Sequence, residues 1–142
     1  MISTSGSPGR PTVLVACRKN AGRSQAAAAL MRHYAGDRVQ VLSGGSEPAD
    51  EVHPEVREVL AERGLVPEEQ PKRFDPAMVK AADVVVTMGC GEECPYYPGR
   101  TYLDWEVADP QGLSVDQVRE IVDDIDGRVR GLLAELGLSV AQ

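Results

Sequence analysis

The chain lacks several features that would define whole classes of protein. None of its apolar runs approaches the roughly 20 residues needed to span a bilayer. Its 15 Lys and Arg residues are outnumbered by 22 Asp and Glu residues, so the formal net charge is −7. No basic patch or basic tail is evident, which argues against nucleic acid or an anionic membrane as a partner. With 42% apolar and 26% charged residues, the composition excludes a disordered or collagen-like chain.

The N-terminal segment and the number of cysteines both bear on the class of protein. Residues 1–11 are rich in Ser, Gly and Pro and lack the apolar stretch of a secretory signal. We therefore expect a flexible tail over residues 1–11, a single domain over residues 12–142 and a cytoplasmic location. Three cysteines do not fit a disulfide scaffold, which needs an even number. In a reducing compartment, cysteines are more often catalytic, redox-active or metal-binding.

Strand and helix patterns alternate along the chain. Runs of β-branched and other apolar residues predict strands over 12–16, 39–42, 84–88 and 100–104. Alanine-rich or amphipathic stretches predict helices over 24–34, 54–63, 76–82 and 114–136, and Asp75 is the expected cap of the third. This alternation predicts an α/β fold of three layers, α/β/α, with a central four-stranded parallel sheet.

The last helix, over 114–136, has a capping-box pattern in Ser114 and Gln117 and an apolar face at steps of three and four residues. Gly127 and Gly131 weaken it by about 1 kcal/mol each relative to alanine. Its acidic run, Asp123, Asp124 and Asp126, is interpreted as a solvated face.

The first strand leads into the most informative segment of the chain. Cys17 follows that strand at its carboxyl end, where open α/β sheets bind their ligands. The backbone N–H groups of Arg18 to Arg23 come next, and then a helix begins. Free N–H groups and the positive end of a helix form an anion cradle, and the same field favours a cysteine thiolate. The predicted oxyanion-binding residues are Arg18, Lys19, Asn20, Ala21, Gly22, Arg23 and Ser24.

Each side chain of this loop has an expected task. Gly22 allows the backbone to curl tightly, and Arg23 offers a planar fork to a tetrahedral oxyanion. The Ser24 hydroxyl donates to the Cys17 thiolate, caps the helix, or does both. The Asn20 amide ties the loop to its surroundings.

The pattern Cys17-x5-Arg23-Ser24, between a VLVA strand and an SQAA helix start, resembles the signature of the low-molecular-weight tyrosine phosphatase family. That fold serves phosphatases and arsenate reductases. Cys90 and Cys94, in MGCGEECP, resemble the distal cysteines of thioredoxin-coupled arsenate reductases. The pattern Trp105-x3-Asp109-Pro110 is also similar to the reductases, since Gln111 stands where phosphatases usually have tyrosine. The resemblance implies that Asp109 is the general acid.

The resemblance also implies a reaction, the reduction of arsenate to arsenite in arsenic detoxification. Cys17 attacks arsenic with Arg23 holding the oxyanion and Asp109 giving a proton, Cys90 then attacks the Cys17 sulfur, and Cys94 attacks Cys90. Thioredoxin, which receives its electrons indirectly from NADPH, would reduce the Cys90–Cys94 disulfide. The resemblance implies no bound cofactor and no metal. The order of attack follows only from the order in the chain and from Pro95. We expect the segment from Gly89 to Gly99 to be mobile, because its cysteines must approach one another as they oxidise.

Several alternatives stay open. A reductase of the same fold could use mycothiol and a mycoredoxin in place of thioredoxin, or the chain could be a tyrosine phosphatase. A non-enzymatic module that binds oxyanions or senses redox state would need the loop but not Asp109. Cys90 and Cys94 could instead ligate zinc with His33 or His53. Asp104 competes with Asp109 for the role of acid.

Overall fold

The computed structural model describes residues 10–67, 70–88 and 99–138. The elements in chain order are β1 (Thr12–Cys17), α1 (Arg23–Ala35), the short 3-10 helix η1 (Gly36–Arg38), β2 (Gln40–Gly45), α2 (Pro54–Glu62), α3 (Pro76–Ala81), β3 (Val84–Met88), β4 (Thr101–Asp104) and α4 (Val115–Glu135).

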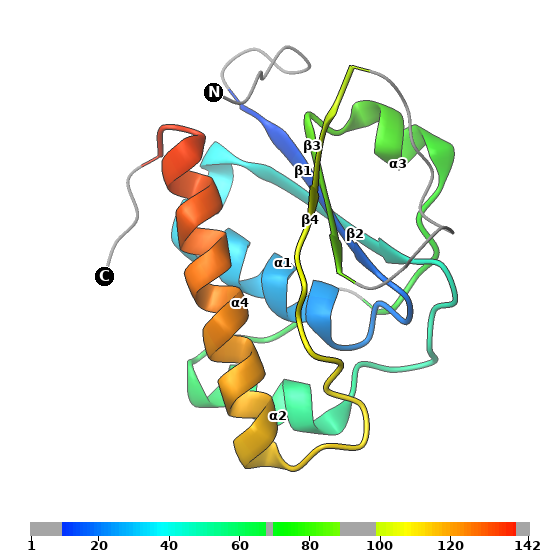
Figure 1. The fold of residues 1–142 in the computed structure, drawn as a ribbon, viewed down its shortest axis with the longest axis vertical. Coiled ribbons are helices and arrows are strands. Elements are labelled where there is room, and N and C mark those ends of the chain that lie inside the picture. The colour runs from blue at the N-terminus through cyan, green and yellow to red at the C-terminus, as the bar shows by residue number, and fades with distance from the viewer. Residues whose placement is uncertain (1–9, 68–69, 89–98, 139–142) are drawn as a thin grey trace.

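The four strands form one parallel sheet in the order β2-β1-β3-β4. The predicted α/β fold with a central four-stranded parallel sheet is therefore confirmed, and Figure 1 shows helices on both faces of it. The second strand is longer than predicted, because Ser43 to Gly45 continue the pairing in register with Val15 to Cys17. Because the strands are parallel, their carboxyl ends all lie at one edge of the sheet, where Cys17 is found.

The two faces of the sheet are covered unequally. Along β1, Val13 and Val15 belong to the large apolar core that includes residues of α1, α2 and α4. Leu14, between them, belongs to a smaller core with Val79 of α3. Successive side chains of a strand point to opposite faces, so one fully buried strand supplies both cores. The face with the large core is covered by α1, α2 and α4, which we call the thick layer. Helix α1 of this layer begins directly after the Cys17 loop.

Helix α1 runs through the middle of the thick layer. Its four consecutive alanines, Ala26 to Ala29, are all buried. Small side chains let this helix lie close to the sheet on one side and to α4 on the other. The position of α1 sets the position of its N-terminus, and so of the loop that follows Cys17.

The predicted helix starts are confirmed. The Asp75 carboxylate accepts a hydrogen bond from the Met78 backbone N–H at 2.9 Å and caps α3. Ser114 and Gln117 form a reciprocal capping box at the start of α4. Helix α4 has 21 residues, yet within the described residues no helix combines the length and the apolar character that a bilayer crossing requires.

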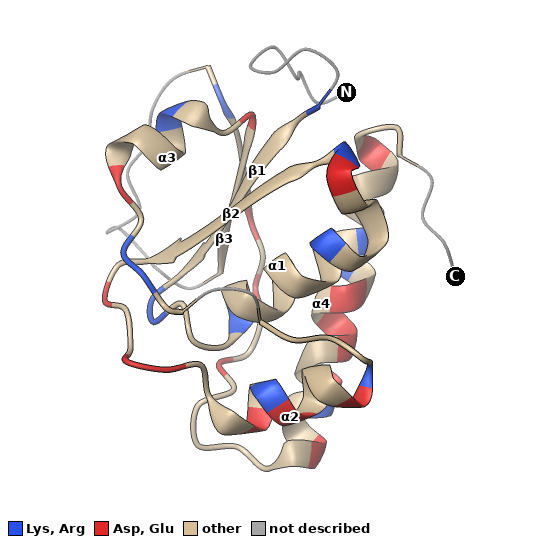
Figure 2. Cartoon of the chain, turned by 180° about the vertical axis from the view of Figure 1, so that it is seen from behind, with Lys and Arg blue, Asp and Glu red and all other residues tan. Residues whose placement is uncertain are grey.

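The interpretation of the acidic run of α4 as wholly solvated is wrong for Asp126. Its side chain is buried and accepts a hydrogen bond from the Tyr34 hydroxyl at 2.5 Å. Arg130 and Arg63 also reach this carboxylate, at 3.1 and 3.6 Å. Acidic residues recur along α4 in Figure 2. Through Tyr34 and Arg63, Asp126 joins α4 to α1 and to the end of α2. Three donors from different elements compensate the burial of its charge.

We expect Gly127→Ala to stabilise the protein by about 0.5–1 kcal/mol, and Gly131→Ala to do the same. Both glycines lie inside α4, and an added Cβ would meet nothing within 4 Å. Gly36→Ala is the matched control, because its Cβ would also meet open space but its φ is +57°. Chemical denaturation should show a gain at 127 and 131 and a loss at 36. A loss at all three positions would contradict the expected gain in α4.

We expect Tyr34→Phe to destabilise the protein by about 1–2 kcal/mol near pH 7 and to flatten its stability at alkaline pH. The hydrogen bond to the Asp126 carboxylate raises the pKa of Tyr34 above 10.0, and burial adds to this rise. A raised pKa in the folded state means that stability is fully present below pH 10 and falls as pH rises through the folded value. Denaturation at several pH values checks this. A parallel decline in both proteins above pH 10 would show that Tyr34 is not responsible.

Candidate active site

The candidate site begins where β1 ends. Cys17 is the last residue of β1 and is 2% exposed. The loop after it ends at Gly22, and α1 begins at Arg23 with no acidic residue in its first turn. The positive end of a 13-residue helix is therefore directed at the loop without a neighbouring carboxylate in that turn.

The carbonyl groups of the loop are held from outside by the segment between β2 and α2. The carbonyl of Arg18 accepts from the Glu47 N–H at 2.8 Å, and that of Lys19 accepts from the Ala49 N–H at 2.9 Å. The N–H of His53, just before α2, donates to the carbonyl of Ala21 at 2.8 Å. This segment thus surrounds the loop on its outer side.

The two remaining carbonyls are bonded within α1. The Gln25 side chain donates to the carbonyl of Asn20 at 2.9 Å, and the Ala26 N–H donates to the carbonyl of Gly22 at 2.9 Å. No cis peptide bond occurs in the described residues, and a trans peptide directs its C=O and N–H to opposite sides. The N–H groups of residues 19 to 23 therefore point away from these partners, as an anion cradle requires.

A chain of hydrogen bonds leads to the cysteine sulfur. The amide Nδ2 of Asn20 donates to the Ser24 Oγ at 2.6 Å, and that oxygen lies 3.0 Å from the Cys17 Sγ. Because the Asn20 Nδ2 group can only donate, the proton of the Ser24 hydroxyl is available for the sulfur. The backbone N–H of Lys72 donates to the Asn20 Oδ1 at 3.0 Å and fixes the amide orientation. Ser24 makes no capping bond to α1, so only the first of its two expected tasks appears in the geometry.

The left-handed residue of the loop is Asn20, with φ +50°. Asparagine tolerates this region better than other residues with a side chain, and here both ends of its amide are bonded. Gly22, which was expected to let the loop curl, has φ −135° and ψ −85°, a conformation that is neither helical nor extended. Gly22 is also required for the space that it leaves beside the loop. A Cβ there would lie 2.6 Å from the Pro110 Cγ and 3.1 Å from the His53 Cδ2.

Sequence reasoning missed the residues that support the loop from below. A Cβ at Gly45 would lie 2.5 Å from the Arg18 carbonyl oxygen and 2.9 Å from the Asn20 nitrogen, so only glycine fits at the end of β2. Gly45 also exchanges backbone hydrogen bonds with the 72–74 segment. The adjacent glycines Gly44 and Gly45 are the signal in the sequence that could have indicated this close approach.

The acid candidate Asp109 lies beside the arginine of the loop. Its Oδ2 is 3.7 Å from the Arg23 Nη2, and the Arg23 Nη1 donates to the carbonyl of Val107 at 3.3 Å. Asp104, the competing carboxylate, instead accepts a hydrogen bond from the Thr87 hydroxyl at 2.9 Å. The structure therefore brings Asp109, and not Asp104, to the guanidinium.

Cys90 and Cys94 lie outside the described residues, as does the 89–98 part of the segment expected to be mobile. The described part ends at Met88, which stands in register with Cys17 on the neighbouring strand. Within the described ranges no group of three or more His, Cys, Asp or Glu residues could hold a metal ion. His33 lies on α1 against Tyr34, and His53 precedes α2, so the two histidines are on separate elements.

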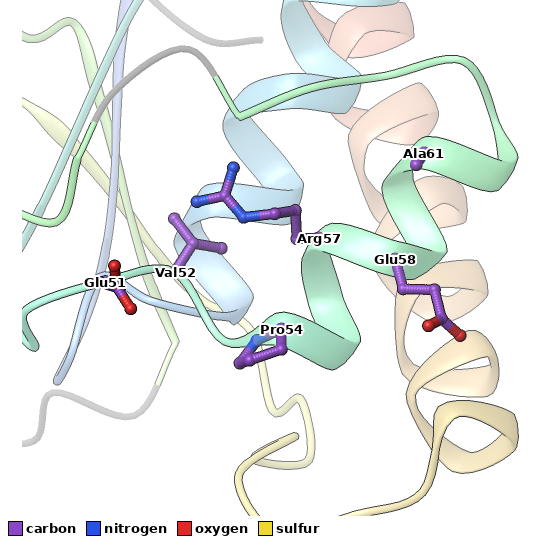
Figure 3. Close-up of a pocket in the computed structure, with 6 residues that line it drawn as sticks. All are labelled: Glu51, Val52, Pro54, Arg57, Glu58 and Ala61. Carbon is purple, nitrogen blue, oxygen red and sulfur yellow. The ribbon is translucent and has the colours of Figure 1, made fainter.

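A separate hollow lies on the outer side of α2 (Figure 3). Its volume is about 400 Å³. The lining residues are Glu51, Val52, Pro54, Arg57, Glu58 and Ala61. None of them belongs to the Cys17 loop, so this hollow does not contribute to the candidate site.

The geometry of this site defines a class of protein. A family model described as low molecular weight phosphotyrosine protein phosphatase matches residues 12–142. The chain belongs to this family, as the loop signature indicated.

Relatives within the family have more particular names. A Halobacterium salinarum protein named "Putative arsenate reductase" is 40% identical over 125 residues, which is 84% of this chain and 88% of that protein. The glutaredoxin arsenate reductase of Synechocystis is 27% identical over 128 residues, or 87% of this chain and 97% of that protein. A solved structure, the thioredoxin-dependent arsenate reductase of Corynebacterium glutamicum, is 48% identical with a TM-score of 0.81. It aligns with 89% of this chain, which spans only 62% of that longer chain.

We expect Ser24→Ala to slow the alkylation of Cys17 at neutral pH by about tenfold, because the thiolate loses a hydrogen bond worth about 1.5 kcal/mol. Ser46→Ala is the control, since the buried Ser46 hydroxyl has no hydrogen-bond partner. Iodoacetamide labelling followed by mass spectrometry of the Cys17 peptide separates this thiol from the other two. Equal labelling rates in the two variants would show that the Ser24 contact does not activate the sulfur.

Proposed function

We propose that this chain is an arsenate reductase in which Cys17, Cys90 and Cys94 act in sequence and a thioredoxin-type protein restores the thiols. The observation that carries the proposal is the joint placement of Cys17, the N–H groups of its loop and the Arg23–Asp109 pair. Arsenate matches phosphate in charge and shape, so a cradle of this family suits it. The arsenate reductase names of the relatives agree with this choice.

In the first step the Cys17 thiolate attacks arsenic, and an As–O bond breaks. Asp109 gives a proton to the departing oxygen, which leaves as water. Arg23 and the loop N–H groups compensate the charge of the oxyanion as the Cys17–arsenic bond forms. Arsenic is still pentavalent after this step, and no electron has been transferred.

In the second step the Cys90 thiolate attacks the sulfur of Cys17. A disulfide forms between the two, the S–As bond breaks, and its electron pair passes to arsenic, which leaves as arsenite. The register of Met88 with Cys17 supports this assignment, because Cys90 is only two residues beyond Met88. Neighbouring strands are about 4.8 Å apart, so a short chain segment suffices to reach the sulfur.

In the third step Cys94 attacks Cys90 and releases the Cys17 thiolate. The Cys90–Cys94 disulfide accepts two electrons from the dithiol of thioredoxin, which is itself restored at the expense of NADPH. This assigns the enzyme to the cytoplasm, where thiols are kept reduced, with residues 12–142 as the working domain. In the alternative mycothiol route, the small thiol forms the arsenic adduct and a mycoredoxin or glutaredoxin-like protein resolves it, so the distal pair of cysteines is not needed.

The decisive experiment is a thiol count. Fully reduced protein, freed of external thiol, receives one equivalent of arsenate, and free thiols are titrated after unfolding. We expect a fall from three thiols to one, with one arsenite released. No fall would contradict the internal cascade and leave a reductase that depends on a small thiol, or a phosphatase.

Two variants test the order of attack. We expect Cys94→Ser to release one arsenite and to retain a Cys17–Cys90 disulfide, because the cascade stops before its last exchange. Cys90→Ser should release none, and Cys17→Ser is the inactive control. The reverse result for the two distal variants would make Cys94 the first attacker. Full turnover of an aryl phosphate by Cys90→Ser, without any arsenate reduction by the unaltered chain, would identify a phosphatase.

A further inference from the structure

The two neighbouring residues Asp109 and Pro110 have opposite environments. The Asp109 side chain is 54% exposed, whereas Pro110 is buried. A proline that is buried directly after an exposed carboxylate restricts where that carboxylate can lie, because its φ is fixed near −65°.

Pro110 is buried against the loop that holds Cys17. Its Cγ and Cδ would lie 2.6 and 3.5 Å from a Cβ at Gly22, so its ring occupies the space that a side chain at Gly22 would need. Pro110 and Gly22 also line one small gap together with Val56 of α2 and with Val118 and Ile121 of α4. The ring is thus wedged between the N-terminus of α1 and two other helices.

Val107, two residues before Asp109, is buried in the large core as well, whereas the polar contacts nearer Asp109 are exposed. The Gln111 N–H donates to the Asp109 Oδ1 at 3.0 Å, and Arg128 donates to the carbonyl of Glu106 at 3.1 Å. Arg23 reaches the carbonyl of Val107 and Asp109, but the same guanidinium must also serve the oxyanion. Exposed polar contacts contribute little individually in water. The contact between Pro110 and Gly22 does not use any group that the substrate needs.

We propose that Pro110 is a positioning residue for the general acid, and that Gly22 lacks a side chain in order to admit the Pro110 ring. This proposal rests on the function proposed above, since the acid role of Asp109 belongs to that function. Pro110 does not touch the reacting atoms. It couples the acid-bearing segment to the oxyanion loop, so that Asp109 and Cys17 keep a fixed separation.

The test is a double-mutant cycle between Pro110→Ala and Asp109→Asn, read as arsenite release at saturating arsenate. A well-placed acid contributes about 10²-fold or more, so we expect Asp109→Asn alone to cost about 100-fold. Pro110→Ala alone should cost about tenfold, because a displacement of about 1 Å suffices for a loss of this order. In the Pro110→Ala background, Asp109→Asn should then cost only about tenfold more. The half-saturating arsenate concentration should change less than twofold, since Arg23 and the loop N–H groups are retained.

Leu136→Ala is the matched control for stability. Leu136 is partly buried against the same large core but lies at the opposite end of α4. Its effect should multiply with that of Asp109→Asn, because the two sites are independent. Multiplying effects for Pro110→Ala as well, or an unchanged rate in that variant, would overturn the positioning role.

Gly22→Ala approaches the same contact from the other side, since its methyl group would displace the Pro110 ring. It should show the same reduced effect of Asp109→Asn. If the unaltered chain releases no arsenite, the proposed function fails, and the same cycle is then measured with aryl phosphate hydrolysis, which consumes no electrons.

Amide exchange gives a readout that needs no activity. Pro110→Ala should speed exchange at Gln111 and Leu113, whose N–H groups donate to Asp109 and to the carbonyl of Pro110. Unchanged exchange at both amides would contradict the proposal even if the rates agreed with it.

Discussion

The carbonyl groups of residues 18 to 22 must all be bonded away from Cys17 before the N–H groups between them can face an oxyanion. Three of the five partners come from the segment between β2 and α2, and two come from α1. The end of β2 must therefore lie close beneath the loop, which Gly45 permits. The start of α2 must lie beside it, so that His53 can donate. The parallel sheet brings these segments to one edge, and the loop takes its shape from them.

This arrangement explains how an acidic protein can hold an anion. The net charge of −7 opposes long-range attraction, and the loop relies on backbone dipoles and on Arg23 at short range. Acidic side chains of α4 are partly offset by arginines, as in the Arg128–Asp124 pair and the group around Asp126. Asp126 shows that one of these carboxylates is also part of the interior, where it connects α1, α2 and α4. Residues of the same three helices line the gap beside Pro110, which directly follows the proposed acid Asp109.

Cys17 and Asp109, the proposed nucleophile and the proposed acid, are thus carried by two segments that meet at the N-terminus of α1. Cys17 is fixed by the end of β1 and by Ser24, and Asp109 is fixed by its neighbour Pro110 and by Arg23. The cysteine is almost fully buried while the carboxylate is exposed, which suits a small oxyanion reached from solvent. A thiol that resolves the arsenic adduct must come within bonding distance of a sulfur at the floor of this loop. The departure of the chain from Met88, beside Cys17, agrees with a resolving thiol from the same chain.

The sequence by itself determined the order of strands and helices, the helix caps and the loop signature, because these depend on residues close together in the chain. Asp75, Ser114 and the run from Cys17 to Ser24 could be interpreted without a structure. Three points depended on the tertiary structure: the left-handed conformation of Asn20, the placement of Asp109 beside Arg23, and the burial of Asp126. Each is decided by partners far away in the sequence, such as Lys72 for Asn20, Arg23 for Asp109 and Tyr34 for Asp126. Gly22 shows the same limit, since nothing local distinguishes a glycine needed for curvature from one that leaves room for a proline 88 positions later. Local patterns fix which element forms, whereas packing between elements fixes which side chains meet.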